Sequence, residues 1–162
     1  MDSLRGIEAL LFDVFGTVVD WREIVTDQLI KSASSEAGYW DAFAVEWRQN
    51  YYQKTRNVAN GSSESTNIDI IHREILDSML KSPKWSHLVE GWDDTRRSES
   101  VHFWHTLNGW PDTTEGLYAL KKRFILGTLS NGSARLLVDM AKHADLPWDI
   151  VFSGDIIGRA LL

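Results

Sequence analysis

Apolar and polar positions alternate along the chain with two different periods, which together predict a parallel sheet interrupted by helices. Residues 7–13, Ile-Glu-Ala-Leu-Leu-Phe-Asp, form a short apolar run that ends in an acid and a glycine turn, a pattern typical of a buried parallel strand. Further strands are predicted at 124–130 and at 149–153, on either side of a helix over 133–144.

The segment between the first two strands has the apolar spacing of amphipathic helices. The apolar residues that recur at intervals of three or four are Trp21, Ile24, Val25 and Leu29, then Phe43, Trp47 and Tyr51, then Ile68, Ile71, Ile75 and Met79. The pair Ser82-Pro83 predicts the end of the third helix. Farther along, Asp112 with Glu115 three residues later predicts a capping box at the start of another helix.

These elements predict an α/β fold, because strands that alternate with helices form a parallel sheet against which the helices pack. We expect a doubly wound, Rossmann-like core made of residues 1–18 and 108–162, with an inserted α-helical cap domain over 19–107. Seven of the eight tryptophans fall within this insert or at its edge. We expect these rings to pack helices together; the alternative is that they line an apolar pocket.

The amino-acid composition excludes several kinds of catalytic and metal site and argues against some classes of binding partner. The 162-residue chain has no cysteine, which excludes disulfide frameworks, thiolate zinc sites, iron–sulfur clusters and cysteine nucleophiles. It carries 17 basic and 23 acidic residues, a net charge of -6, which argues against a general nucleic-acid binder. The apolar run near the start of the chain is interrupted by charged residues, so we expect that it is neither a signal peptide nor a membrane span. We expect a cytoplasmic protein.

Chemistry-bearing residues stand at the predicted carboxyl ends of two strands, where open parallel sheets bind their ligands. The first group runs from Phe12 to Thr17 and the second from Thr128 to Gly132. Asp13, next to a glycine turn, can act as a carboxylate nucleophile. The Ser-Asn-Gly turn opens a helix, so its hydroxyl, amide and helix-terminal N–H groups can bind an anionic substrate. Taken separately, each group is also explained as a helix cap or an ordinary turn.

Taken in order, and separated by a helical insert, these groups resemble the haloacid dehalogenase superfamily, and most closely its 2-haloacid dehalogenase branch. Residues 11–17 (Leu-Phe-Asp-Val-Phe-Gly-Thr) resemble its first motif and residues 129–132 (Leu-Ser-Asn-Gly) its second. Residues 47–49 (Trp-Arg-Gln), within a predicted helix of the insert, resemble a further element of that branch. The resemblance covers essentially the whole chain and implies a hydrolase that cleaves the carbon–halogen bond of small 2-haloalkanoic acids.

The resemblance also implies a role for each site residue. The Asp13 carboxylate displaces halide from the α carbon and forms an ester on the enzyme, which water hydrolyses to the 2-hydroxy acid. Thr17 positions Asp13, Ser130 holds the substrate carboxylate, and Asn131 with Arg48 cradles the departing halide. No metal or organic cofactor is required. The residues that contact the small-molecule substrate, a 2-halocarboxylate, are Val14, Phe15, Gln49, Tyr52 and Gly132.

Phe15 distinguishes two kinds of chemistry within the superfamily. The phosphatases keep a second Asp two residues after the nucleophile, where it protonates the leaving alcohol and later activates water; here that position is Phe15. Such general acid catalysis typically contributes ~10²–10⁴-fold. Halide leaves without protonation, so Phe15 favours carbon–halogen cleavage and adds an apolar wall beside the carboxylate. A phosphatase of small phosphomonoesters is the alternative with the same fold.

The family's pattern continues past the end of this sequence. A lysine that stabilises nucleophile and substrate, and a later strand with residues that activate water, have no counterpart up to Leu162. We therefore expect a C-terminally truncated core, impaired turnover, and an exposed edge on the strand that carries Asp13. An apolar edge strand invites pairing with another chain, which makes a homodimer a candidate assembly. The alternative outside catalysis is a regulatory remnant of the fold.

Arg48 and the histidines also have simpler interpretations. A charged residue on a polar helix face is commonly just solvated, although a guanidinium is always charged and weakly hydrated, which suits a halide acceptor. His102 and His105 lie three residues apart and could face a metal, but no third ligand is identifiable in the sequence.

Overall fold

The computed structural model describes residues 5–32, 39–59 and 67–157. By its internal contacts the chain divides into two compact units. One, the α/β unit, contains residues up to Trp21 and from Thr106 onward; the other, the helical unit, contains Arg22–His105.

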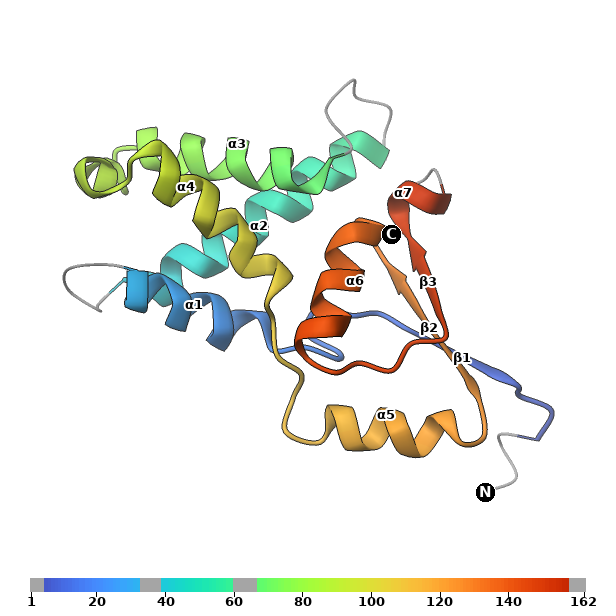
Figure 1. Cartoon of the computed structure of the whole chain (residues 1–162). Helices are drawn as coiled ribbons and strands as arrows, with labels where there is room; N and C mark the ends of the chain where they lie inside the picture. Colours follow the sequence, from blue (N-terminus) through green and yellow to red (C-terminus); the bar gives the residue numbers. More distant parts are fainter. Residues whose placement is uncertain (1–4, 33–38, 60–66, 158–162) are drawn as a thin grey trace. The chain divides into compact units, whose positions relative to one another are not determined.

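The α/β unit is built on a parallel sheet of three strands, as the sequence predicts. In the described residues β2 (Ile125–Ser130) lies between β1 (Ala9–Phe12) and β3 (Ile150–Ser153), with Phe12 aligned to Thr128 and Ser130 to Ser153 (Figure 1). Along the chain, α5 (Thr113–Lys121) precedes β2, α6 (Ala134–His143) connects β2 to β3, and the short α7 (Gly154–Ile157) follows β3.

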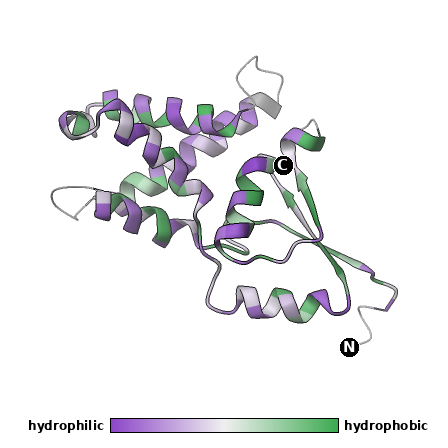
Figure 2. Ribbon diagram, viewed as in Figure 1, coloured by the Kyte–Doolittle hydropathy of each residue, from purple (hydrophilic) through white to green (hydrophobic). Residues whose placement is uncertain are grey.

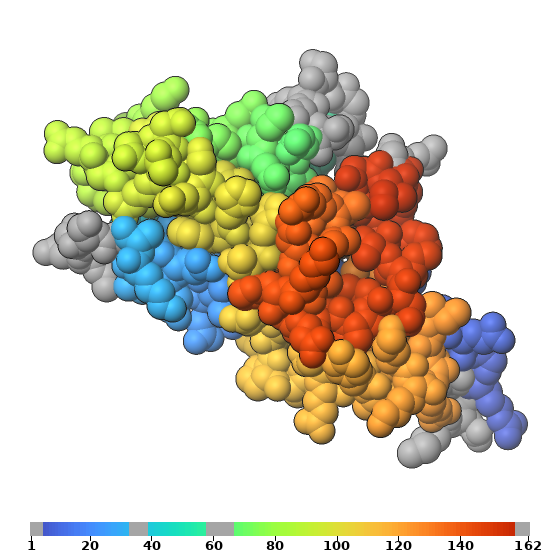
Figure 3. Space-filling model, in the orientation of Figure 1, coloured from blue at the N-terminus to red at the C-terminus, as the bar shows by residue number. Residues whose placement is uncertain are grey.

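Helices pack against one face of this sheet. The residues of β2 that face them, among them Leu126 and Thr128, are fully buried, as are Leu136 and Met140 of α6. Atoms of α5 and α6 form much of the surface of this unit that is visible in Figure 3. Since apolar side chains from strand and helix meet there, this layer is the core of the unit.

The opposite face of the sheet is open among the described residues. Its large apolar side chains keep between 40% and 54% of their surface exposed; they are Ile7, Leu11, Ile125, Leu129 and Ile150. The strands are correspondingly green in the hydropathy view of Figure 2. The predicted burial of the first strand is wrong for Leu11, whose side chain is half exposed. The exposed edge that the sequence also predicts on this strand is present in the described ranges, where β1 is the outermost strand beside β2.

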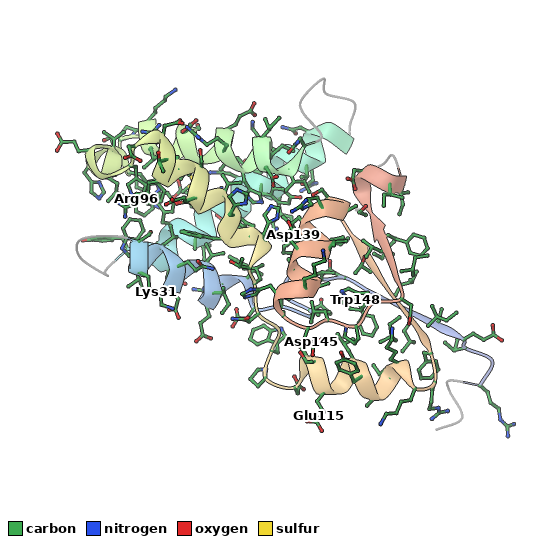
Figure 4. The ribbon with its side chains drawn as sticks, in the orientation of Figure 1. Lys31, Arg96, Glu115, Asp139, Asp145 and Trp148 are labelled. Carbon is green, nitrogen blue, oxygen red and sulfur yellow. The ribbon has the colours of Figure 1, made fainter. Side chains whose placement is uncertain are left out.

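Side-chain hydrogen bonds fix the ends of the elements around the sheet. Asp149, just before β3, accepts a hydrogen bond from the Leu126 amide (2.9 Å) and another from Lys121 at the end of α5. These interactions, the Leu126 hydrogen bond first, lower the pKa of the Asp149 carboxyl. Asp145, labelled in Figure 4, follows α6 in a left-handed conformation (φ +51°) and accepts a hydrogen bond from Tyr118 on α5 (3.0 Å).

The predicted capping box at Asp112 is wrong. Asp112 has nearly helical backbone angles (φ -100°, ψ -4°) and its side chain makes no capping hydrogen bond. A capping residue needs an extended backbone for its side chain to reach back to the helix amides. The first side chain of α5, Thr113, instead donates its hydroxyl proton to the carbonyl of Val18 (2.9 Å). The start of α5 is thus held by a contact between segments far apart in the sequence.

The helical unit contains α1 (Trp21–Ser32), which begins at the unit boundary, α2 (Trp40–Ala59), α3 (Ile68–Lys81) and α4 (Asp94–Val101). Two short 3-10 helices, η2 (Ser86–Gly91) and η3 (His102–His105), flank α4. Figure 1 shows α2 and α3 packed side by side. Asn67 and Asp93 cap α3 and α4 with their side chains, and α3 ends at Lys81, directly before the Ser82-Pro83 pair that predicts its end.

Aromatic rings fill the core of the helical unit. The ring of Phe43 lies 5.0 Å from that of Trp85 and 5.8 Å from that of Trp92, measured between centroids. Trp47 and Trp104 are fully buried. Arg96, labelled in Figure 4, connects α4 to the end of α1 by a hydrogen bond to the carbonyl of Ser32, and to the end of η2 by another to the carbonyl of Gly91. The prediction that the tryptophans serve mainly to pack helices is confirmed for these buried rings.

Candidate active site

Two of the predicted site segments leave the sheet at the same edge. Phe12 is aligned with Thr128 in adjacent parallel strands, so Asp13, directly after β1, and Ser130, the last residue of β2, both lie at the carboxyl ends of their strands. This is the edge at which open parallel sheets bind ligands. The register thus brings the first and second motifs to neighbouring positions.

A tight loop after β1 presents the Asp13 carboxylate. The carbonyl of Val14 accepts hydrogen bonds from the amides of Val18 (2.9 Å) and Val19 (3.1 Å), which closes the chain on itself. Gly16 has φ +89°, a conformation that L side chains rarely adopt, so the predicted glycine turn is confirmed. Within this loop the Thr17 hydroxyl donates to Asp13 Oδ2 (3.2 Å).

The side chains after Asp13 have different surroundings. The Val14 side chain is buried. Phe15 is half-buried and lies against the second motif: a Cβ atom added to Gly132 would stand 3.3 Å from the Phe15 ring and 3.1 Å from Leu137. A side chain at position 132 would crowd both neighbours, which explains the glycine there.

The second motif forms the turn into α6. The Gly132 amide donates to Ser130 Oγ (3.2 Å), and Ser133 caps the helix by accepting from the Leu136 amide (3.2 Å). Ser130 is buried and Asn131 is half-buried between these two turn contacts. The predicted sequence of strand, Ser-Asn-Gly turn and helix is therefore present.

Asp155, to which the sequence pattern assigns no role, lies at the amino end of α6. Its carboxylate accepts hydrogen bonds from the amides of Ala134 (3.0 Å) and Ile156 (3.1 Å) and from the Ser153 hydroxyl. One helix-terminal amide is thus bound to Asp155 and another, that of Leu136, to Ser133, so these two are not open donors for an anionic substrate, contrary to expectation. Asp155 also follows a strand end, which is the signal that could have found it.

Arg48 is in the helical unit and is buried, with only 4% of its surface exposed. Its guanidinium lies 4.4 Å from the ring centroid of Tyr52, 5.1 Å from that of Tyr51 and 5.7 Å from that of Trp104. Its Nη2 donates to the Tyr52 hydroxyl (3.0 Å). These are cation–π distances, so the alternative interpretation of Arg48 as a solvated surface charge is wrong.

The other two predicted residues of this segment are more exposed. Tyr52, one helical turn after Arg48, keeps 46% of its surface exposed while contacting the guanidinium. Gln49 is exposed on the same helix. Burial raises the pKa of the neighbouring Tyr51 to about 12 against the opposing effect of Arg48, so its phenol stays protonated at neutral pH.

The described residues give no support for a metal site. His105 pairs with Asp69 (Nε2 to Oδ1, 3.0 Å), and its ring lies 5.3 Å from that of His102. Over the described ranges no group of three His, Cys, Asp or Glu side chains has the arrangement of a metal site.

None of the helices within those ranges has the length and hydropathy needed to cross a membrane.

The chain is similar to solved L-2-haloacid dehalogenases. It is 35% identical to L-2-haloacid dehalogenase PA0810 over 95% of its own length (TM-score 0.81) and 38% identical to the defluorinating L-2-haloacid dehalogenase Rha0230 over 93% (TM-score 0.82). It spans 65% and 61% of the lengths of these two proteins.

A more distant match shows the same fold. The L-2-haloacid dehalogenase from Xanthobacter autotrophicus, solved with chloropropionic acid covalently bound, is 22% identical over 94% of this chain and 59% of its own (TM-score 0.78). A scan against protein-family models finds no match, and neither does a search of curated proteins.

Proposed function

Because this chain has the haloacid dehalogenase-like fold and resembles the L-2-haloacid dehalogenases, we propose that it is a hydrolase that cleaves the carbon–halogen bond of small L-2-haloalkanoic acids. The observation that supports this most is the end of β1. There Asp13 accepts a hydrogen bond from Thr17, and the residue two positions later is an aromatic ring, Phe15, packed beside Gly132.

In the first step, one oxygen of the Asp13 carboxylate attacks the α carbon of the substrate. A carbon–oxygen bond forms, the carbon–halogen bond breaks, and its electron pair leaves with the halide. The product is an ester between Asp13 and the 1-carboxyalkyl group, with inversion at the α carbon. The Thr17 hydroxyl, 3.2 Å from Oδ2, holds one carboxylate oxygen and so orients the other.

In the second step, water adds to the carbonyl carbon of the Asp13 ester. The ester bond breaks, the 2-hydroxy acid leaves, a proton is released, and the Asp13 carboxylate is restored. Substrate and water supply every atom of the products. This scheme calls for neither metal nor organic cofactor, in keeping with the family resemblance.

The remaining roles follow from charge and polarity. We assign the substrate carboxylate to Ser130 and the backbone of the turn at Gly132, and the halide to Asn131 and Arg48. A guanidinium held against aromatic rings keeps its charge and is poorly hydrated, which suits a large, weakly hydrated anion. Tyr52, Gln49, Phe15 and Val14 remain the proposed substrate contacts, and the helical unit the proposed cap.

Phe15 argues against phosphoryl transfer by the same site. A leaving alkoxide needs a proton from an acid at this position, and a phenylalanine ring has none to give. Halide is the conjugate base of a strong acid and leaves without one.

The test is incubation of the full chain with L-2-chloropropionate, with chloride release and the mass of the Asp13-containing peptide as readouts. We expect either chloride release in turnover or, if hydrolysis is slow, one equivalent of chloride with a 1-carboxyethyl ester on Asp13. Asp13→Asn should abolish both. Asp112→Asn, an exposed aspartate of the same unit whose side chain does not cap α5, is the matched control and should behave as the parent chain.

The alternatives give different results. Magnesium-dependent release of phosphate from a small phosphomonoester, lost in Asp13→Asn, would show a phosphatase and overturn the proposal. Absence of chloride, ester and phosphate from a folded protein would also overturn it and favour a non-catalytic role for this fold.

A further inference from the structure

His72 of α3 lies in the middle of a stack of three rings drawn from separate elements. Its imidazole is 4.6 Å from the ring of Tyr51 on α2, at an interplanar angle of 3°, and 4.5 Å from the ring of Trp104 on η3, at 18°. The indole of Trp47 stands edge-on to it at 5.8 Å and donates its Nε1 proton to the His72 carbonyl (3.2 Å). Ring and backbone of His72 are both held in place.

Arg48 lies against both outer rings of this stack. Its guanidinium is within cation–π distance of Tyr51 (5.1 Å) and of Trp104 (5.7 Å). The imidazole of His72 lies between these two rings, fills the space there and keeps them apart. Removal of that ring would leave a void, and the walls of a void shift and lose contacts.

We propose that His72 is the positioning residue for Arg48, holding Tyr51 and Trp104 apart at the spacing that fixes the guanidinium for anion binding. The inference rests on the proposed function, in which Arg48 takes the departing halide. His72 acts through the two outer rings and does not itself touch the substrate.

The charge state of His72 fits this role. Burial holds the pKa of His72 well below its usual range, and electrostatic repulsion from Arg48 and His105 lowers it further. The ring is therefore uncharged at neutral pH. The charged and titratable groups around it are Arg48 and Tyr51 on α2, Asp69 on its own helix, and His105 on η3, which pairs with Asp69. An uncharged spacer neither repels the guanidinium nor competes with it for an anion.

The stability of the folded chain does not explain why the ring at position 72 is an imidazole. Its Nδ1 is buried and has no hydrogen-bond partner among the described residues. A buried polar atom without a partner lowers stability, whereas a phenylalanine ring would fill nearly the same space without that penalty. We therefore expect that position 72 needs a flat, uncharged ring. His72→Phe keeps such a ring, and His72→Ala removes it.

The test measures chloride binding to the full chain by the broadening of the chloride NMR signal. The Arg48→Gln variant gives the broadening that does not depend on Arg48, which is subtracted. We expect His72→Ala to weaken the Arg48-dependent binding roughly tenfold, the loss expected when two cation–π contacts are disturbed. His72→Phe should bind as the parent does, and added imidazole should restore binding to His72→Ala by filling its void.

A control separates positioning from general destabilisation. Leu76→Ala truncates another fully buried residue of α3 and should lower stability without changing chloride affinity. Equal losses of chloride affinity in Leu76→Ala and His72→Ala would overturn the proposal, as would unchanged affinity in His72→Ala.

A second readout keeps the two proposals apart. If the parent chain and Arg48→Gln bind chloride equally, the proposed function fails at Arg48. The positioning of Arg48 is then judged by hydrogen exchange of its Nε proton, which should be slow in the parent and in His72→Phe and fast in His72→Ala. Slow exchange in all three would overturn the role of His72.

Discussion

The two units of this protein bury their apolar side chains to different extents. In the helical unit, the large rings of Trp47, Trp85 and Trp104 are almost entirely buried, and the helices enclose them. In the α/β unit, one face of the sheet is equally buried while the other leaves Leu11 and Ile125 about half exposed.

Parallel sheets normally have both faces covered, because each strand is apolar on both sides. The helical unit is therefore closed in the described residues, whereas the α/β unit is closed on one side. A sequence rich in apolar residues thus does not specify how many of them are buried. We expect substitutions to have their largest effects in the closed unit and on the covered face of the sheet.

The largest effect is expected for Trp47→Ala in the helical unit. Its ring contacts Phe43, His72 and Trp104, so truncation leaves a large cavity and should lower the free energy of unfolding by roughly 3–5 kcal/mol. Chemical denaturation measures this. Trp110→Ala, which removes a partly exposed ring, is the control and should cost less than about half as much. Similar losses would show that the helical unit is not the closed core described above.

Two neighbouring residues of β2 compare the faces of the sheet directly. Leu126 is fully buried and Ile125 is 54% exposed, so Leu126→Ala should cost about 2–5 kcal/mol and Ile125→Ala well under about 1.5 kcal/mol. Denaturation of both variants under the same conditions tests the comparison. If Ile125→Ala is as destabilising as Leu126→Ala, the face that carries Ile125 is covered in solution.

A smaller effect is expected from pH. Because the folded chain holds the pKa of His72 well below the usual 6.5, below about pH 6.5 the unfolded chain binds a proton that the folded chain does not. The free energy of unfolding is thus unaffected by His72 above that pH and falls by at most ~1.4 kcal/mol per unit of pH below it.

His72→Phe removes this proton-linked loss and serves as the reference. The difference in unfolding free energy between the parent and His72→Phe should therefore grow as the pH falls from about 6.5 to 5. A constant difference over that range would contradict a neutral, buried His72.

The smallest effect on stability is expected at the edge of the sheet. Leu11 lies on the exposed face of β1, so Leu11→Lys should change the free energy of unfolding by no more than about 0.5 kcal/mol. If β1 pairs with a second chain, the same substitution should shift a dimer toward monomer in sedimentation, because a charge on an edge strand opposes pairing. Val89→Lys, at an exposed apolar residue of the helical unit, should leave the assembly unchanged.

The order and type of the elements follow from the amino-acid sequence alone. Helical spacing and strand runs depend on contacts between residues close in the chain, and for this reason β1, β2, β3, α3 and α6 lie where the pattern predicts them. The absence of cysteine and the Asp-Val-Phe-Gly-Thr segment around Asp13 likewise limit the chemistry through residue types alone.

Which of the predicted features are used depends on the tertiary fold. The fold leaves Asp112 without a capping role, exposes Leu11, places the Asp155 carboxylate on the start of α6, and surrounds Arg48 with three aromatic rings. Apart from Tyr51 and Tyr52, which lie on the same helix as Arg48, the groups that decide these outcomes belong to segments far apart in the chain. Burial and partnership are properties of such contacts, and no local pattern of residues contains them.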